Sequence, residues 1–327
     1  MKPKVLISRA IFPEVIAKLT QQFEVTSNQE DVLWTQPELI EQLTGKQGVF
    51  TTGGERIDAT LLAACPDLKI CANMAVGYNN FDLDAMSAAG VLATNAPDVL
   101  TETTADLGFA LLMATARRMA ESEHFLRAGL WTRWRYDMFI GSDIHGATLG
   151  ILGMGRIGQA IARRGVHGFG MKVIYHNRTP LDARAEADCK ARYVSKQELL
   201  KRADHLVLVL PYSASSHHAI GTAELAQMKR TATLVNIARG GIVDDAALAQ
   251  ALRDRVIAAA GLDVFEGEPK VHPDLLQLPN VVLTPHIGSA TLPTRLAMAH
   301  LAADNLIGYL VHRKPLTPLN LGMTVRT

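Results

Sequence analysis

The sequence has 327 residues, a length that suits two domains of ordinary size better than one core. Its 33 basic and 32 acidic residues leave a formal net charge of +1, which argues against nucleic-acid or membrane binding and favours a small neutral or anionic ligand. Cys65, Cys71 and Cys189 follow no metal-ligand spacing, and no apolar stretch approaches the roughly 18 residues of a spanning helix. We therefore expect a cytoplasmic protein without a metal site.

Short apolar runs alternate with helical patterns along the chain, which is typical of β-α-β units and parallel sheets. Strands are predicted over residues 5–7, 49–52, 68–72 and 91–94 in a first series, and over 149–152, 173–176, 206–210, 233–237, 260–264 and 281–284 in a second. A long helix over 101–119, which begins with threonines and ends in paired arginines, separates the two series. A final helix over 292–311 would return the chain to the first domain. The second series, with six strands, suffices for a dinucleotide-binding sheet.

A glycine-rich turn joins the first two elements of that second series. Gly153, Gly155 and Gly158 form a G-x-G-x-x-G between a strand and an amphipathic helix. The first glycine permits the tight turn, the second lets the backbone approach a pyrophosphate, and the third lets the helix pack closely on the strand. The amino terminus of the helix would then receive the negative charge. The context predicts dinucleotide binding.

The next strand, over 172–176, is followed by Asn177 and Arg178 instead of an acidic residue. NAD-binding enzymes usually place Asp or Glu here to accept a hydrogen bond from the ribose 2′-OH. A carboxylate would repel a 2′-phosphate, whereas Arg178 and Asn177 would bind one through charge-assisted hydrogen bonds. The sequence predicts NADP(H) as the preferred cofactor, with NAD(H) as the alternative.

Three later strands each lead into a charged residue. Arg239 follows the strand at 233–237, Glu266 and Glu268 follow the strand at 260–264, and His286 follows the strand at 281–284. The carboxyl ends of neighbouring parallel strands face one crevice, so an arginine, a glutamate and a histidine are expected to converge there. Convergence at the strand ends alone does not decide whether Glu266 or Glu268 is the partner of His286.

With its motifs GMGRIG, NIARGG, GLDVFEGEP and TPHIGSAT in this order, the chain resembles the D-isomer-specific 2-hydroxyacid dehydrogenases over essentially its whole length. Within that family it is most similar to bacterial glyoxylate/hydroxypyruvate reductases that also act as 2-ketogluconate reductases. The resemblance implies an α/β fold of two Rossmann-like doubly wound domains. A discontinuous substrate domain (1–98 and 292–327) would hold an inserted dinucleotide-binding domain (99–291). It also implies NADPH-dependent reduction of small 2-keto acids and a homodimer.

The resemblance also assigns roles to single residues. Arg239 would bind the carboxylate and 2-oxo group of the substrate, His286 would be the acid/base, and Glu268, which matches the family motif better than Glu266, would orient His286 and stabilise its positive charge. Further expected substrate contacts are Val76, Gly77, Leu100 and Trp134, the last reaching the partner subunit or serving dimer packing. Further expected cofactor contacts are Arg156, Ile157, Thr104, Pro211, Ala238 and Asp263.

Three other functions are consistent with the fold. An NAD-dependent phosphoglycerate dehydrogenase is disfavoured by Arg178, and a formate dehydrogenase by Glu268, because those enzymes have glutamine in that position. A dinucleotide-sensing transcriptional corepressor is disfavoured by the absence of an extended tail or basic segment. His217 and His218 are interpreted as surface residues or residues at the start of a helix, without a metal-binding role.

Overall fold

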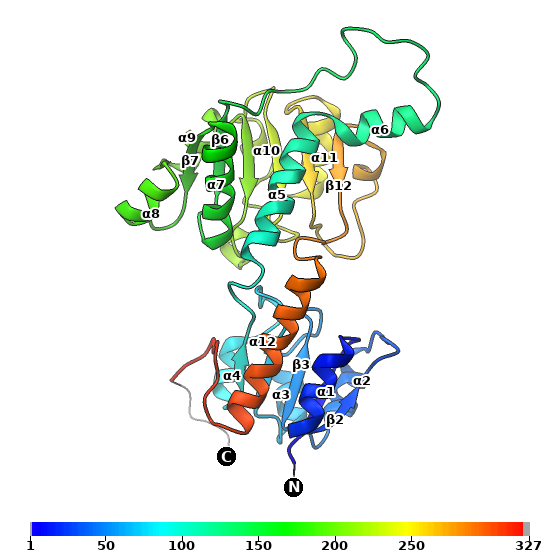
Figure 1. Cartoon of the computed structure of the whole chain (residues 1–327), viewed down its shortest axis with the longest axis vertical. Helices are drawn as coiled ribbons and strands as arrows, with labels where there is room; N and C mark the ends of the chain where they lie inside the picture. Colours follow the sequence, from blue (N-terminus) through cyan, green and yellow to red (C-terminus); the bar gives the residue numbers. More distant parts are fainter. Residues whose placement is uncertain (1, 323–327) are drawn as a thin grey trace. The chain divides into compact units, whose positions relative to one another are not determined.

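The computed structural model describes residues 2–322, which form two compact units, each built around a parallel sheet (Figure 1). Within the described chain, unit 1 comprises residues 2–100 and 290–322, and unit 2 comprises residues 101–289. This is the predicted α/β class with two Rossmann-like units. The limits of the units lie two residues from the breaks at 98 and 292 that the sequence suggests.

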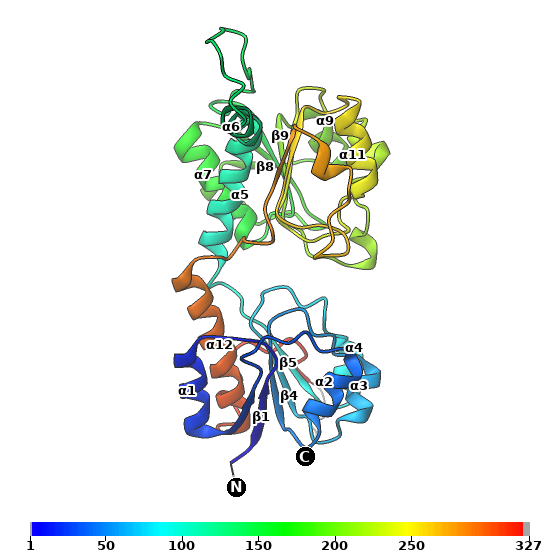
Figure 2. The same ribbon diagram turned by 90° about the vertical axis from the view of Figure 1, so that its right-hand side faces the viewer.

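Unit 1 has a five-stranded sheet of order β2-β1-β3-β4-β5, in which neighbouring strands run parallel. Its helices α1 and α12 cover one face, and α2, α3 and α4 cover the other (Figure 2). The elements of unit 1 are β1 (Lys4–Ile7), α1 (Pro13–Gln22), β2 (Glu24–Ser27), α2 (Gln36–Leu43), β3 (Gly48–Thr51), α3 (Ala59–Ala64), β4 (Ile70–Asn73), α4 (Leu83–Ala88), β5 (Leu92–Thr94) and α12 (Leu292–Leu310).

The two faces of that sheet have separate cores because side chains alternate along a strand. On β1, Val5 and Ile7 pack with Leu19 of α1 and Leu306 of α12. Leu6 points the other way and packs with residues of α2, α3 and α4. The helix at the end of the chain therefore completes the core of the first hundred residues.

Unit 2 has a seven-stranded parallel sheet of order β12-β11-β10-β9-β6-β7-β8, which is the strand order of doubly wound dinucleotide-binding sheets with β12 added at one edge. Helices α5 and α7 cover one face, and α9 and α11 cover the other (Figure 2). Its elements are α5 (Thr101–Ala116), α6 (Met119–Arg127), β6 (Thr148–Leu152), α7 (Arg156–Phe169), β7 (Lys172–His176), α8 (Ala183–Asp188), β8 (Ala191–Tyr193), α9 (Lys196–Arg202), β9 (His205–Leu208), η1 (Ala214–Ser216), α10 (Thr222–Leu225), β10 (Thr233–Asn236), α11 (Asp245–Arg253), β11 (Ala259–Leu262), η2 (Leu275–Gln277) and β12 (Val281–Leu283).

Two strands of the fold are absent from the sequence-based prediction, and both lie at a sheet edge. They are β2, with the sequence EVTS, and β8, with the sequence ARY. Both are at most half-buried and contain no continuous apolar run, the pattern that predicts buried strands. The second series consequently has seven strands and not six.

The prediction of one long helix over 101–119 is wrong about where the helix ends. α5 ends at Ala116, and a new helix, α6, begins at Met119. Arg118 between them has a φ of +52°, in the left-handed region, and its guanidinium pairs with Glu121 of α6. The chain therefore changes direction at these arginines, where the sequence predicts the end of a single helix (Figure 1). Among the described residues, no helix is both long enough and apolar enough to cross a membrane.

Candidate active site

The turn that follows β6 can be built only with glycine at two of its positions. Gly153 has a φ of +100°, and a Cβ there would lie 2.6 Å from the amide nitrogen of Leu210. Gly158 lies in α7, and a Cβ there would lie 2.5 Å from the carbonyl oxygen of Gly153. The first glycine brings the turn against the exit of β9, and the last brings the helix against the turn.

Gly155, between them, has nothing within 4 Å of where a Cβ would stand. It is the N-cap of α7, where glycine has no side chain to cap the helix, and the first turn of α7 has no acidic residue. An uncapped helix amino terminus beside open space is a site for a phosphate group. The residues present here therefore fit the pyrophosphate of a dinucleotide.

The side chain of Asn177 has a role in this turn that sequence reasoning missed. Its Oδ1 accepts a hydrogen bond of 2.6 Å from the backbone N–H of Met154, in the middle of the glycine motif. Asn177 thus ties the exit of β7 to the turn after β6. This hydrogen bond occupies one acceptor site of the side-chain oxygen, and the side-chain NH₂ group remains for the predicted phosphate contact.

Around Arg178, the nearby carboxylates are engaged elsewhere. Asp182 accepts from the backbone N–H of Ala185 at 2.8 Å as the N-cap of α8, and Glu186 accepts from the hydroxyl of Tyr175 at 2.7 Å. Burial, together with Glu186, raises the pKa of Tyr175 to about 12. Arg178 is exposed and makes no hydrogen bond or ion pair with the described residues. The exit of β7 therefore presents a cation and no free acid.

At the exits of β10 and β11, two backbone segments touch. Arg239 follows β10, and a Cβ on the next residue, Gly240, would overlap the carbonyl of Phe265 after β11. Arg239 is half-buried, and its Nη1 donates to the carbonyl of Ala238 at 2.7 Å. Burial lowers the pKa of Arg239, while the carboxylate of Glu268 raises it. Arginine stays protonated in proteins, so the guanidinium near Glu268 is a cation.

His286 pairs with Glu268, as the family motif implied. Nδ1 of His286 lies 2.7 Å from Oε2 of Glu268, whose Oε1 accepts from the N–H of Phe265 at 2.9 Å. Burial opposes ionisation of Glu268, but the hydrogen bonds from His286 and Phe265 outweigh it and lower its pKa. The side chain of His286 is 47% exposed, and its Nε2 makes no hydrogen bond with the described residues. A histidine held at one nitrogen and open at the other suits proton transfer.

The backbone of His286 is held by Asp263, another feature that the sequence does not reveal. His286 has a φ of +52°, and its N–H donates to the carbonyl of Asp263 at 2.9 Å. The buried carboxylate of Asp263 accepts from the hydroxyl of Thr284 at 2.7 Å and from the N–H groups of Ile287 and Gly288, both at 2.8 Å. Burial raises the pKa of Asp263 against these hydrogen bonds. This carboxylate thus fixes the turn that carries the histidine.

The other residues expected to contact the cofactor lie at several places in unit 2. A Cβ on Gly288 would stand 3.2 Å from Asp263 and 3.4 Å from Thr104, so these two expected cofactor contacts share one corner of unit 2. Ala238 is buried beside Arg239, and its N–H donates to Asn236 at 3.0 Å. The remaining expected cofactor contacts are the exposed Arg156, the half-buried Ile157 in the first turn of α7, and the exposed Pro211 after β9.

In unit 1, the loop after β4 has its carbonyl groups occupied and its N–H groups open. Asn95 donates to the carbonyl of Val76 at 2.7 Å, and Asn73 donates to the carbonyl of Gly77 at 2.9 Å. The N–H groups of Val76 and Gly77 make no hydrogen bond with the described residues. Two open N–H groups in a half-buried loop are suited to a carboxylate. Leu100 is buried at the end of the first segment of this unit.

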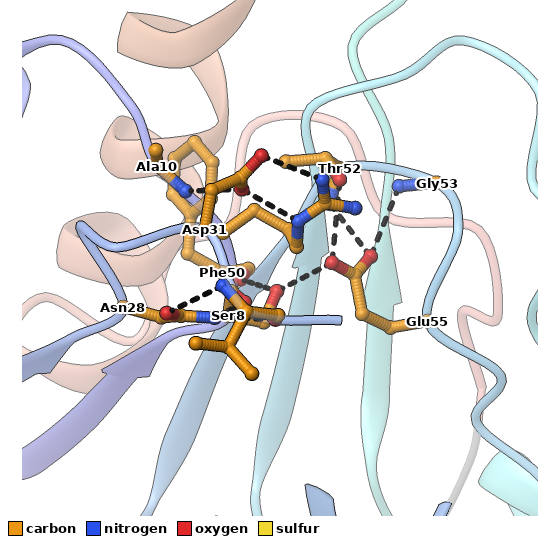
Figure 3. A network of polar contacts seen from close by, with 10 residues as sticks. Ser8, Ala10, Asn28, Asp31, Phe50, Thr52, Gly53 and Glu55 are labelled. Atoms are coloured by element: carbon orange, nitrogen blue, oxygen red, sulfur yellow. Dashed lines mark hydrogen bonds and ion pairs between the residues drawn. The ribbon is translucent and has the colours of Figure 1, made fainter. Parts of the chain in front are cut away.

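The neighbouring exits of β1 and β3 are closed by a carboxylate of the chain itself (Figure 3). Glu55 accepts from the hydroxyl of Ser8 at 2.7 Å and from the N–H groups of Thr52 and Gly53 at 2.9 and 3.2 Å. Nearby, Arg9 makes a two-point ion pair with Asp31. These exits lie at the point where the strand order of unit 1 reverses, the usual ligand position in such sheets.

The segment that begins with α6 and leads to β6 extends away from the sheet of unit 2 (Figure 1), and its sequence contains Trp134. The side chain of Trp134 is 75% exposed, and that of Tyr136 is 85% exposed. We call residues 119–140 the aromatic arm. Its other exposed large apolar side chains are Met119, Leu126, Leu130, Trp131 and Ile140.

Comparison with known proteins identifies the family. The model of the NAD-binding domain of D-isomer specific 2-hydroxyacid dehydrogenases matches residues 109–288. A glyoxylate reductase of Thermococcus onnurineus is 48% identical over 98% of this chain and 96% of its own length. A glyoxylate/hydroxypyruvate reductase B of Yersinia pestis is 45% identical over 95% of both chains.

Solved structures agree. One is an NADPH-dependent glyoxylate/hydroxypyruvate reductase from Sinorhizobium meliloti in complex with NADP and malonate, with a TM-score of 0.88 and 36% identity over 98% of this chain and 97% of that one. A glyoxylate reductase from Paecilomyes thermophila also has a TM-score of 0.88, with 33% identity over 97% and 98%. The sequence motifs, the two parallel-sheet units and these similarities together show that the chain belongs to the D-isomer specific 2-hydroxyacid dehydrogenase family and is an NAD(P)-dependent oxidoreductase.

Proposed function

We propose that the protein reduces small 2-keto acids, glyoxylate and hydroxypyruvate first, to D-2-hydroxy acids with NADPH as the preferred reductant. The observation that carries the proposal is the pairing of His286 with Glu268 beside the cationic Arg239, at adjacent strand exits of unit 2. This is a proton donor next to a group that binds carboxylates. Relatives named as glyoxylate and glyoxylate/hydroxypyruvate reductases support the substrate class.

The cofactor, when bound, supplies a hydride to the carbonyl carbon. Arg239 pairs with the carboxylate of the keto acid and polarises its carbonyl group. As the carbonyl oxygen gains the electron pair, protonated His286 gives it a proton from Nε2, and a 2-hydroxy acid results. Glu268 keeps Nδ1 of the ring occupied and stabilises the positive charge. Val76, Gly77 and Leu100 keep the substrate-contact roles expected from the sequence.

The cofactor would lie with its pyrophosphate at Gly155 and the start of α7, where the structure has open space and an uncapped helix end. Arg178 would pair with the 2′-phosphate. The support for NADPH over NADH is that Asp182 and Glu186 are committed to a helix cap and a tyrosine, so no free carboxylate follows β7. The NADP-bound reductase of Sinorhizobium meliloti is a precedent in a similar structure.

A longer sugar acid such as 2-ketogluconate is the further substrate candidate. A cavity of about 310 Å³ in unit 1 is lined by residues that include Arg9, Gln36 and Glu55, a size that suits a small molecule. At Gly53, which Glu55 holds, a Cβ would stand 3.3 Å from that of Ala75, next to Val76 and Gly77. To bind the hydroxyl groups of a sugar chain, Arg9, Gln36 and Glu55 would exchange their present hydrogen bonds with Asp31, Asp58 and Ser8.

We also propose that the protein is a homodimer and that the aromatic arm forms the interface. Exposed apolar side chains crowded into one segment are typical of a protein–protein contact. Trp134 either reaches the active site of the partner subunit or packs in the interface. Light scattering on the purified chain should give twice the mass of 35.5 kDa, and a monomer at micromolar concentration would contradict the proposal.

The mechanism is tested by His286→Ala. Its kcat with glyoxylate and hydroxypyruvate should fall by roughly 10²- to 10⁴-fold, the usual contribution of a general acid, while the dissociation constant of NADPH stays within about twofold. His300→Ala, which removes an exposed histidine paired with Glu14 in unit 1, is the matched control and should keep full activity. Near-normal turnover by His286→Ala would exclude the proposed proton donor.

A further inference from the structure

Two consecutive histidines of unit 2 lie outside the site described above. His217 and His218 follow η1 in the segment after β9, and they stack with ring centroids 3.9 Å apart and an interplanar angle of 22°. Nε2 of His218 lies 2.9 Å from Oε2 of Glu266, in the turn after β11. All three residues are exposed. The proposed reduction uses none of them.

The backbone explains why two neighbours in sequence present their rings together. In an extended segment, successive side chains point to opposite sides. His218, however, has a φ of +48°, and its N–H donates to the carbonyl of Gly241 at 2.7 Å. This left-handed residue turns the chain, so that both imidazoles lie on the side of Glu266. Asp244 adds negative charge, with its Oδ2 3.8 Å from Nδ1 of His218.

Among the residues that the structure describes, His217, His218 and Glu266 are the only group of three or more His, Cys, Asp or Glu whose ligand atoms all lie within 4.8 Å of one another. Imidazole nitrogens with one carboxylate oxygen are typical ligands of zinc and its neighbours, whereas calcium and magnesium prefer sets of oxygens. We propose that these three side chains bind a divalent transition-metal ion, Zn²⁺ foremost, with water completing the coordination. This departs from the expectation, drawn from the sequence, that the two histidines have no metal-binding role.

Such an ion would join two loops of unit 2. His217 and His218 belong to the segment after β9 that also contains Pro211 and Tyr212, whose hydroxyl lies 3.1 Å from Nδ1 of His217. Glu266 belongs to the turn before Glu268, and its N–H donates to Asp245 at 3.0 Å. The bound ion would therefore hold the segment after β9 against the turn after β11 and raise the unfolding temperature.

The test is titration calorimetry of the full chain with zinc chloride, after removal of any affinity tag and treatment with a chelator. The parent should bind one ion per chain with a dissociation constant below about 10 μM, and zinc should raise its unfolding temperature. His217→Gln and Glu266→Gln should each weaken binding by at least about tenfold. Zinc-free unfolding temperatures identify any variant that fails to fold, and His217→Asn serves as a second, smaller replacement.

Two control variants decide where zinc binds. His300→Gln removes the exposed pair of His300 with Glu14, and His286→Gln removes the pair of His286 with Glu268. Both should bind zinc like the parent. Binding only at millimolar zinc, equal affinity in His217→Gln and the parent, or a loss confined to His286→Gln would each overturn the proposal.

Discussion

The carboxyl edges of the two sheets have similar topology and different chemistry. In unit 1, β1 lies between β2 and β3; in unit 2, β6 lies between β7 and β9, and in both the strand order reverses there. After β6 the chain forms the glycine turn, with open space at Gly155 and an uncapped helix end. After β1 it continues into Ser8, whose hydroxyl donates to the carboxylate of Glu55 (Figure 3).

This difference shows that topology marks a place for a ligand but does not choose the ligand. In unit 1, the N–H groups after β3 are already satisfied by Glu55, a charge that would repel a phosphate. The helices after β1 and β6 differ as well: α1 has Glu14 in its first turn, whereas α7 of unit 2 has no acid there. Dinucleotide binding therefore follows from the residues after the first strand, and we assign it to unit 2 alone.

The largest effect is expected from the catalytic side of unit 2. Arg239→Lys keeps the charge but loses the planar fork that grips a carboxylate, so kcat/KM for keto acids should fall by roughly 10²-fold, the usual cost of a misplaced substrate. Arg253→Lys, on α11 and paired with Asp274, should leave the kinetics unchanged. Equal kinetics for Arg239→Lys and the parent would make Arg239 a structural residue.

The choice of cofactor is tested at Arg178. Because hydrogen bonds to charged groups are strong, Arg178→Ala should raise the dissociation constant of NADPH by about 10- to 100-fold and leave that of NADH nearly unchanged. Arg184→Ala, at an exposed arginine of α8, removes the same charge from the neighbourhood and should affect neither. Equal losses for the two cofactors would contradict a contact between Arg178 and the 2′-phosphate.

The glycine turn sharpens the comparison of the two sheets. Gly155→Ala places a methyl group in the open space and should weaken NADPH binding on the order of tenfold without changing the unfolding temperature. Gly158→Ala meets the carbonyl of Gly153 and should destabilise the fold by roughly 1–3 kcal/mol. Gly54→Ala, at an equally open position in unit 1, should change neither quantity. Loss of NADPH binding in Gly54→Ala would contradict the assignment of the cofactor site to unit 2.

The smallest effect concerns pH. The folded-state pKa of Glu268 is lowered, so its contribution to stability is fully present above the ordinary glutamate range and is lost as the pH falls through the lowered value. The free energy of unfolding of Glu268→Gln should therefore approach that of the parent under acidic conditions and differ most near neutrality. Glu266→Gln, measured in the presence of a chelator, removes the same charge two residues away and serves as the control. Parallel pH profiles for Glu268→Gln and the parent would contradict the assigned ionisation.

Local patterns in the sequence were enough to predict the glycine turn and the parallel sheets. The turn follows from the backbone freedom of single glycines, and the strands follow from short apolar runs. The pairing of His286 with Glu268 came from the resemblance to the family, since the spacing alone left Glu266 open. Contacts between distant segments were not predictable. The hydrogen bond of Asn177 to the glycine turn and the anchoring of the His286 turn by Asp263 depend on which strands become neighbours. A pattern of single residues contains no such information.

The most direct test of the account is a set of initial rates with the parent enzyme. Glyoxylate, hydroxypyruvate and 2-ketogluconate would each be assayed with NADPH and with NADH, alongside formate and 3-phosphoglycerate with both oxidised cofactors. We predict reduction of glyoxylate and hydroxypyruvate, with kcat/KM at least about tenfold higher for NADPH, since one charge-assisted contact is worth that much. Turnover of 3-phosphoglycerate with NAD, a preference for NADH, or cofactor binding without turnover of any keto acid would contradict it.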